Sequence, residues 1–435
     1  MEKAVKEGRK VVSSAVEAHE VTNNNKQKYV PEGWKVCKIN ELLVKVNKPV
    51  KVNNSETYRE IGIRSHGKGI FYKESILGES LGDKSVFWVE PECFIVNIVF
   101  AWEMAVAKTT NNELGFIASH RFPMYRPVEG KLNIDFITYL FKSSRGKHLL
   151  NLASPGGAGR NKTLGQKEFA DLEVTVPSNV DEQRVIAEIL STWDKAIDLK
   201  EKLIEQKKEQ KKGLIQKLLT GKVRLSGFDQ EWKKFNITEI ADKTIVDSFT
   251  DGDWIESPHI TDNGVLFIQT GNIGIGEFIE KDKKKYISED SFIELKCTEV
   301  KPNDILICRL ADPIGRSCLV PNTGYKMVTS VDVTILRVDS LKASAKFINY
   351  LLNLPSNLRK MDSLGAGSTR KRISRKNLGG VTLEIPPLDE QNKIVEVLSC
   401  LDKEILLLKQ EFNEINKQKK GLMQILLSGK VRVKV

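Results

Sequence analysis

The segment QKKGLIQKLLTGKVR occupies residues 210–224, and QKKGLMQILLSGKVR occupies residues 418–432. The two segments lie 208 positions apart (210 against 418) and share residues of varied type, so neither chance nor low complexity explains the match. Self-similarity over such a distance indicates that a whole domain with its following segment was duplicated. The chain is therefore expected to fold as an internal pseudo-two-fold repeat.

The repeat begins well before these segments. DEQ at 181–183 matches DEQ at 389–391, and from there to Arg224 and Arg432 the two copies align without a gap. Proline precedes the acidic residues in both copies, in VPSNVDEQ and in IPPLDEQ. Proline followed by carboxylates favours the first turn of a helix.

Apolar residues then recur at spacings of three and four, which predicts one long amphipathic helix in each copy. The stripe is narrow and is typical of a coiled-coil seam. Gly221 and Gly429 are expected to end the helices, since glycine accepts a left-handed backbone. Such a helix of about 38 residues would be roughly 55–60 Å long. Two separate helices on two unrelated cores remain the alternative. The candidate seam residues are Ile186, Leu190, Trp193, Leu214, Leu218, Ile394, Leu398, Leu401, Leu422 and Leu426.

Weaker similarity joins the segments that precede the two helices. Trp34-Lys35 and Trp232-Lys233 open them, and GGAGRNKTLGQKEF (156–169) corresponds to GAGSTRKRISRKNL (365–378). Strand-like runs with Gly and Asn turns lie between these landmarks, which predicts two mixed α and β domains and an α+β fold class. The expected boundaries are 1–25 for an N-terminal extension, 26–178 for the first domain, 179–225 for the central helix, 226–387 for the second domain and 388–435 for the C-terminal helix.

The composition indicates a soluble globular protein with basic surfaces. Hydrophobic residues make up 40% and charged residues 29%, and the formal net charge is +11. Basic surfaces favour nucleic acid or an acidic partner. The six cysteines lack zinc-ligand spacing, and no apolar run is long enough for a membrane span. The chain is expected to be cytoplasmic and to bind no metal.

Motifs for chemistry are weak. GGAGRNKT resembles a phosphate-binding loop, but Asn161 stands where the last glycine belongs. Asp290 with Glu294 and Lys296 imitates a nuclease cluster, and the first domain lacks a counterpart. The histidines share no spacing with each other or with carboxylates. No catalytic residue is therefore assigned.

Basic and polar loops recur in both domains. Arginine and lysine suit phosphates and guanine, while asparagine and glutamine suit adenine edges. Each loop taken alone is better explained as an ordinary solvated turn, but the recurrence in both domains of a basic chain favours DNA binding. The candidate DNA-binding residues are Arg64, His66, Lys68, Arg160, Asn161, Lys162, Gln269, Thr270, Asn272, Arg309, Arg316, Arg370, Lys371 and Arg372.

This arrangement resembles the specificity subunit of type I restriction-modification enzymes, from about Lys26 onward. The resemblance is strongest in VPSNVDEQ and IPPLDEQ and in the paired G-L-[IM]-Q-x-L-L-[TS]-G-K-V-R endings. The first of these helix starts departs from the pattern, with an extra residue and without a second proline. Residues 1–25 carry no family landmark.

The resemblance implies two target-recognition domains, each reading one half of a split sequence in double-stranded DNA. It implies two long antiparallel helices that set the spacing between the half-sites. The candidate seam residues would then also be the partner-binding residues, presenting the docking surface for two methyltransferase subunits. A restriction and translocase subunit would join through the complex. S-adenosylmethionine, ATP and Mg²⁺ would then be bound by partner subunits, and this chain would bind no cofactor. Two rivals remain: a coiled-coil adaptor without DNA specificity, and a stand-alone nuclease or methyltransferase.

Overall fold

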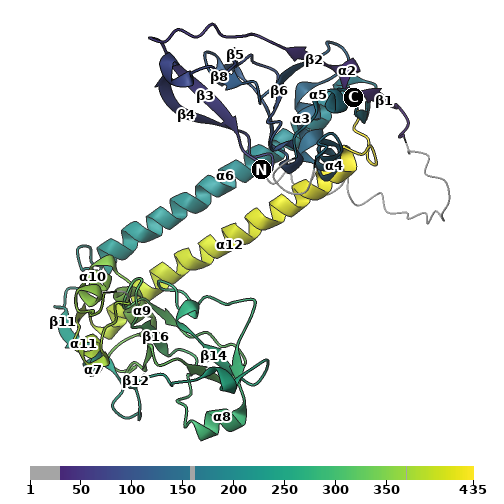
Figure 1. The fold of residues 1–435 in the computed structure, drawn as a ribbon. Coiled ribbons are helices and arrows are strands. Elements are labelled where there is room, and N and C mark those ends of the chain that lie inside the picture. The colour runs from purple at the N-terminus through teal and green to yellow at the C-terminus, as the bar shows by residue number, and fades with distance from the viewer. Residues whose placement is uncertain (1–29, 157–161, 369) are drawn as a thin grey trace, which may run out of the picture. The chain divides into compact units, whose positions relative to one another are not determined.

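The computed structural model describes residues 30–156, 162–368 and 370–435. These residues form two compact units (Figure 1). Unit 1 contains the chain up to Ala196 together with Ile415–Val435, and unit 2 contains Ile197–Glu414. Each unit therefore includes part of both long helices.

Unit 1 is built from antiparallel and mixed sheets with helices packed on them. One sheet has the order β2-β9-β6-β7, another has the order β4-β3-β8-β5 with β3 and β8 parallel, and β1 pairs with β10. The strands are β1 (Trp34–Lys38), β2 (Leu43–Val46), β3 (Thr57–Ile63), β4 (Ile70–Leu77), β5 (Val86–Trp88), β6 (Phe94–Val96), β7 (Val106–Lys108), β8 (Ile117–Ser119), β9 (Met124–Pro127) and β10 (Glu173–Pro177). The shorter helices are α2 (Ile39–Leu42), α3 (Ile134–Lys142), α4 (Ser144–Leu152) and α5 (Gln166–Ala170).

Unit 2 repeats this topology except for the position of one edge strand in the second four-stranded sheet. Its sheets have the orders β12-β19-β16-β17 and β13-β15-β14-β18, with β14 and β18 parallel, and β11 pairs with β20. The strands are β11 (Lys233–Asn236), β12 (Phe249–Asp251), β13 (Ile260–Thr261), β14 (Val265–Ile268), β15 (Tyr286–Ile287), β16 (Ile305–Cys308), β17 (Ser317–Leu319), β18 (Met327–Thr329), β19 (Val333–Leu336) and β20 (Thr382–Ile385). The shorter helices are α7 (Ile237–Ile240), α8 (Glu289–Glu294), α9 (Ala345–Leu352), α10 (Pro355–Ser363) and α11 (Arg375–Gly379).

The central strands are short apolar runs because both of their faces are covered. β14 reads VLFI and β16 reads ILIC, and every residue of both strands is buried. Continuous hydrophobic runs are typical of strands with two buried faces. In unit 1 the core between sheet and helices is aromatic: the Phe94 ring lies 5.2 Å from Phe141 and 6.1 Å from Phe169.

The two long helices are confirmed. α6 spans Val180–Leu218 and α12 spans Leu388–Leu426, and both carry acidic residues in the first turn. Just beyond them, Gly221 and Gly429 have φ angles of 67° and 70°, in the left-handed region expected of the glycine that ends a helix.

Within unit 2 the two helices run antiparallel. Ion pairs join Lys200 to Glu411 at 2.7 Å, Lys207 to Glu404 at 2.8 Å and Lys211 to Asp402 at 2.5 Å. From the first ion pair to the third, the residue number on α6 rises from 200 to 211 while that on α12 falls from 411 to 402, which is the pattern of antiparallel helices. Ile204 and Ile405 are buried in the same stretch.

Candidate nucleic-acid interface

The repeated DEQ motif anchors each domain to its long helix. Gln183 is fully buried, accepts a hydrogen bond from Asn133 N at 2.8 Å, and donates to the carbonyls of Lys131 and Pro177. In unit 2 Gln391 accepts from Ser344 N at 2.9 Å and donates to the corresponding carbonyls of Lys342 and Pro386. In unit 1 the glutamine amide thus joins the loop before α3 and the end of β10 to the start of α6. In unit 2 it joins the loop before α9 and the residue after β20 to the start of α12.

The arginine of the repeated GKVR ending bonds to the glutamate of the DEQ motif, beside the buried glutamine. Arg224 donates to both carboxylate oxygens of Glu390, at 2.6 and 2.7 Å, and its guanidinium lies over the Trp232 ring. The bond to Glu390 raises the pKa of Arg224, so the guanidinium group remains positively charged. Glu390 is buried, and this two-pronged pair neutralises it.

A second repeated cluster lies about three helical turns further along each long helix, at Asp194 on α6 and Asp402 on α12. In unit 1 Tyr139 donates to Asp194 at 2.6 Å and Lys419 pairs with the same carboxylate. In unit 2 Tyr350 donates to Asp402, which Lys211 also contacts. Burial and the neighbouring carboxylate raise the pKa of both tyrosines, so their hydroxyls remain protonated donors.

The candidate seam residues are largely placed in the cores of the two units, which corrects the expectation that they present a docking surface. Their side chains contact the globular domains, and a buried side chain cannot meet another chain without opening the core. Ile186, Leu190, Leu422 and Leu426 belong to the core of unit 1, and Leu214, Leu218, Ile394 and Leu398 belong to the core of unit 2. Leu401 is buried and Trp193 is half-buried.

Four exposed leucines on the long helices were not identified from the sequence. Leu199 and Leu203 on α6 are 63% and 36% exposed, and Leu406 and Leu407 on α12 are 55% and 59% exposed. The pair Leu406 and Leu407 departs from the three- and four-residue spacing of the buried positions, and that departure is the signal that could have identified it.

The unit 1 loop between β3 and β4 presents its basic side chains to solvent. Arg64, His66 and Lys68 are all exposed. The backbone N–H groups of His66 and Gly67 donate to the carbonyls of Glu103 and Met104, which fixes the loop. His66 has a φ of 61°, a conformation that the neighbouring bonds maintain. The loop therefore offers positive charge from a fixed backbone.

The second candidate loop of unit 1 is only partly described. Arg160 and Asn161 lie outside the described residues. Lys162 is half-buried and its Nζ donates to Asn151 Oδ1 at 3.0 Å.

In unit 2 the loop between β14 and β15 (269–285), called the tip loop below, contains an asparagine whose side chain bonds within the loop. Asn272 Oδ1 accepts from Gln269 N at 3.0 Å, and Asn272 Nδ2 donates to Ile279 O at 3.0 Å. Both ends of this amide brace the loop, so the expectation that Asn272 faces a base is corrected. Gln269 and Thr270 are half-buried at the same tip.

The guanidinium groups of buried Arg309 and half-buried Arg316 are bonded within unit 2, which corrects their placement on a DNA-binding surface. Arg309 is 4% exposed, pairs with Asp251 at 2.9 Å, and donates to the carbonyls of Val331 and Ile373. Burial lowers its pKa although Asp251 opposes the shift. Arg316 donates to the carbonyls of Ile273, Leu310, Pro313 and Thr270. Both guanidinium groups therefore hold loops together.

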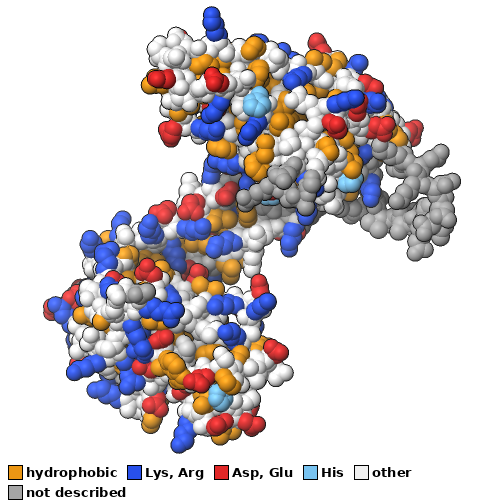
Figure 2. Space-filling view, viewed as in Figure 1, with side chains coloured by type: hydrophobic (Ala, Val, Ile, Leu, Met, Phe, Trp, Pro, Cys, Tyr) orange, Lys and Arg blue, Asp and Glu red, His pale blue; other side chains and the backbone are white. Residues whose placement is uncertain are grey.

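The remaining candidates lie at the surface of unit 2. Arg370 and Arg372 are exposed and Lys371 is half-buried. Lys371 pairs with Asp362 at 2.7 Å and Arg372 pairs with Asp332 at 3.2 Å. Figure 2 shows lysine and arginine side chains spread over the visible face of unit 2, with acidic side chains among them.

Other kinds of site find no support in the described part of the chain. No group of three or more His, Cys, Asp or Glu side chains there could hold a metal ion. No helix among those residues has the length and apolar character needed to cross a bilayer.

Comparison with known proteins gives one consistent result. The family model described as the type I restriction modification DNA specificity domain matches residues 31–208 and again residues 229–417. The MjaVIII type I restriction enzyme specificity subunit of Methanocaldococcus jannaschii is 25% identical over 432 residues, covering 93% of this chain and 94% of that protein. The putative MjaX specificity subunit of the same organism is 27% identical over 326 residues, covering 72% and 71%. In fold, the crystal structure of the HsdS subunit from Thermoanaerobacter tengcongensis matches with a TM-score of 0.54 and 18% identity, over 93% of this chain and 99% of that one.

Proposed function

This chain belongs to the type I restriction modification DNA specificity family, and on that premise we propose how it reads DNA as the specificity subunit of a type I restriction-modification complex. It is the non-catalytic, sequence-specific DNA-binding subunit, and its two repeated domains each read one half of a bipartite target. The long helices join the two readers and fix the gap between the half-sites.

One observation carries the division of labour. The loop between β3 and β4 in unit 1 (64–69) and the loop between β14 and β15 in unit 2 (269–285) occupy the same topological position. The unit 1 loop follows β3, which pairs in parallel with β8, and the unit 2 loop follows β14, which pairs in parallel with β18. Both loops carry basic side chains. Two loops in equivalent positions, different in length and sequence, suit two readers of different half-sites.

The methyltransferase subunits supply the chemistry in this proposal. Two of them would bind one specificity subunit, one for each copy of the repeat, and the restriction subunit would join through them. S-adenosylmethionine, ATP and Mg²⁺ would be bound by those partners. A surface available for one of them is the part of α12 on which Leu406 and Leu407 are exposed. The assembly would act in the cytoplasm, where chromosomal DNA is found.

Methylation mapping tests the proposal. The full chain is co-expressed with its methyltransferase subunit, and methylated positions are located on genomic DNA. We expect a split sequence with two half-sites and a fixed gap. Exchange of residues 226–387 for those of another family member should replace one half-site and leave the other half-site and the gap unchanged.

Two results would contradict it. Methylation that does not depend on this chain, or a single continuous recognition sequence, would rule out two independent readers. A chain that co-purifies with the methyltransferase but never directs it to a defined sequence would support the coiled-coil adaptor instead.

A further inference from the structure

The unit 2 loop 269–285 ends in a run of lysines that directly precedes β15. The sequence of 281–285 is KDKKK, and all five residues are exposed. Phe267 N donates to Lys285 O at 2.8 Å, and Tyr286 and Ile287 then pair with β14. The lysine run is thus fixed beside the strand that leads into the tip loop.

One of the lysines is neutralised within unit 2. Lys284 pairs with Glu280 at 2.7 Å, and its Nζ lies 5.4 Å from the centre of the Tyr325 ring. Lys281, Lys283 and Lys285 have no ion-pair partner among the described residues, and Asp282 is the acidic residue within the run. Three like charges fixed within a few residues repel one another, and a bound anion would relieve that repulsion.

These lysines line a hollow at the tip loop. The hollow has a volume of about 110 Å³. Its charged and amide lining residues are Lys281, Lys283, Lys284, Lys285, Glu280, Gln269 and Asn272. Lys281 Nζ lies across Gly271, where a side-chain carbon would come within 2.4 Å of it. The ammonium group of Lys281 therefore lies beside the loop that Asn272 braces.

We propose that Lys281, Lys283 and Lys285 form a phosphate-binding site that holds the DNA backbone beside the tip loop of unit 2. The inference rests on the proposed function and specifies it, because it gives unit 2 a counterpart to Arg64, His66 and Lys68 of unit 1. Lysine binds phosphate as a point charge, so the site positions the half-site without reading its bases.

Salt-dependent DNA binding tests the site. The full chain in complex with its methyltransferase subunits is titrated against a random-sequence duplex over a range of salt concentrations. In K281Q/K283Q/K285Q the slope of log affinity against log salt should become shallower by about 0.9 for each lost phosphate contact, hence by roughly 2–3 in total. The three side chains are exposed, so the variant should fold normally by circular dichroism.

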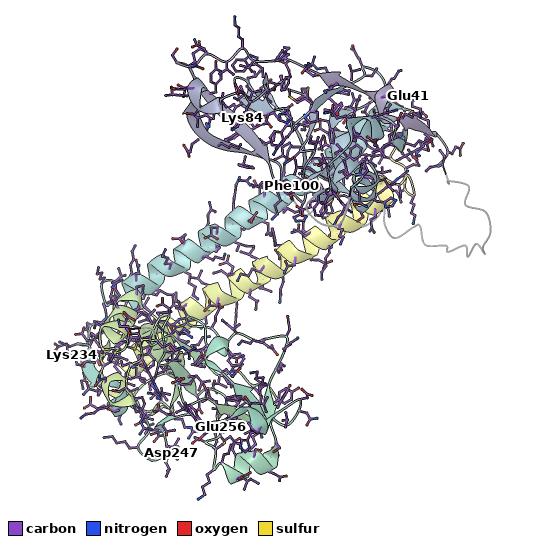
Figure 3. The ribbon with its side chains drawn as sticks, in the orientation of Figure 1. Glu41, Lys84, Phe100, Lys234, Asp247 and Glu256 are labelled. Atoms are coloured by element: carbon purple, nitrogen blue, oxygen red, sulfur yellow. The ribbon has the colours of Figure 1, made fainter. Side chains whose placement is uncertain are left out.

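A matched control removes the same charge elsewhere in unit 2. Lys233 and Lys234 lie on β11, in a sheet separate from β14 and β15, and Lys346 lies on α9 (Figure 3 labels Lys234). K233Q/K234Q/K346Q should change the slope by less than about 0.5, since charges distant from the DNA are screened.

The outcomes separate the inference from the proposed function. A salt slope in K281Q/K283Q/K285Q equal to that of the control overturns the phosphate site while DNA recognition stands. An unchanged slope with loss of methyltransferase binding also overturns it, and assigns the lysines to an acidic protein surface. Absence of any DNA binding by the unsubstituted complex overturns the proposed function together with this site.

Discussion

Arg432 donates from Nε and Nη2 to the carboxylate of Glu182, at 2.6 and 2.7 Å, across 250 positions of sequence. The pair repeats Arg224 with Glu390, and it places the last residues of the chain in the first domain. Gly429 lies against Pro31 and Trp34 in the same way that Gly221 lies against Trp232. The end of α6, which follows the first domain, thus completes the second domain, and the end of α12, which follows the second domain, completes the first. This exchange accounts for the two copies of the fifteen-residue repeat.

Replacement of Arg432 by alanine should destabilise unit 1 selectively. It leaves Glu182, which is 2% exposed, as a buried carboxylate without its cation. Loss of one partner of a fully buried pair costs about 3–5 kcal/mol, and we expect about 1–3 kcal/mol because the Arg432 side chain is 43% exposed. Hydrogen exchange resolved by segment should show faster exchange in β1 and β10. Arg224→Ala is the control, and equal effects of both variants on both units would contradict the assignment.

Buried and exposed leucines of α12 should separate stability from assembly. Leu398 is fully buried, and Leu398→Ala should destabilise unit 2 by about 2–5 kcal/mol through loss of packing and a residual cavity. Leu407→Ala should change stability by less than about 0.5 kcal/mol but weaken methyltransferase binding. Thermal unfolding and co-purification measure the two effects. Full binding by the L406A/L407A variant would exclude this face as the docking surface.

Alanine variants in the tip loop of unit 2 should separate a residue that stabilises the loop from a residue that contacts a base. Asn272→Ala removes two hydrogen bonds of the loop, so it should weaken binding to all sequences and increase proteolysis between residues 269 and 280. Gln269→Ala should leave the loop intact and relax one position of the second half-site by about 1–3 kcal/mol. Methylation mapping combined with limited proteolysis checks both. Relaxed specificity in Asn272→Ala with an intact loop would reverse the two roles.

Asp253 should give unit 2 a distinctive pH dependence. Burial raises its pKa above the ordinary 3.8, although the N–H of Thr298 donates to it at 2.9 Å. The folded state then binds the proton more tightly than the unfolded state, so this group favours folding at low pH and the contribution falls as pH rises from near 3.8 through the raised pKa. Asp253→Asn should remove that component. Denaturant unfolding of both proteins at several pH values should show the wild type losing stability relative to the variant as pH rises, and parallel curves would refute it.

The sequence predicted the long helices because their signals are local. Proline and acids mark the starts, glycine marks the ends, and three- and four-residue spacing marks the faces. It could not predict that Leu190 and Leu398 enter domain cores, because spacing gives a face and not what covers it. Arg309 was chosen for its charge, and only the fold shows that Asp251 and two carbonyls surround it. Lys281 and Gln269 are brought together by the pairing of β14 with β15, a contact across the loop that no local pattern encodes.

The pairing of Arg432 with Glu182 also bears on the order in which the chain matures during synthesis. Unit 2 is a continuous stretch, so all of its contacts can form as soon as Glu414 has emerged from the ribosome. Unit 1 begins first and finishes last, since its core includes Leu426 and Leu427. Domains ordinarily fold in the order of translation, and here the order should be reversed. A prematurely terminated chain would therefore carry a finished second domain and an incomplete first one, so that only a fully translated molecule has both of its domains complete.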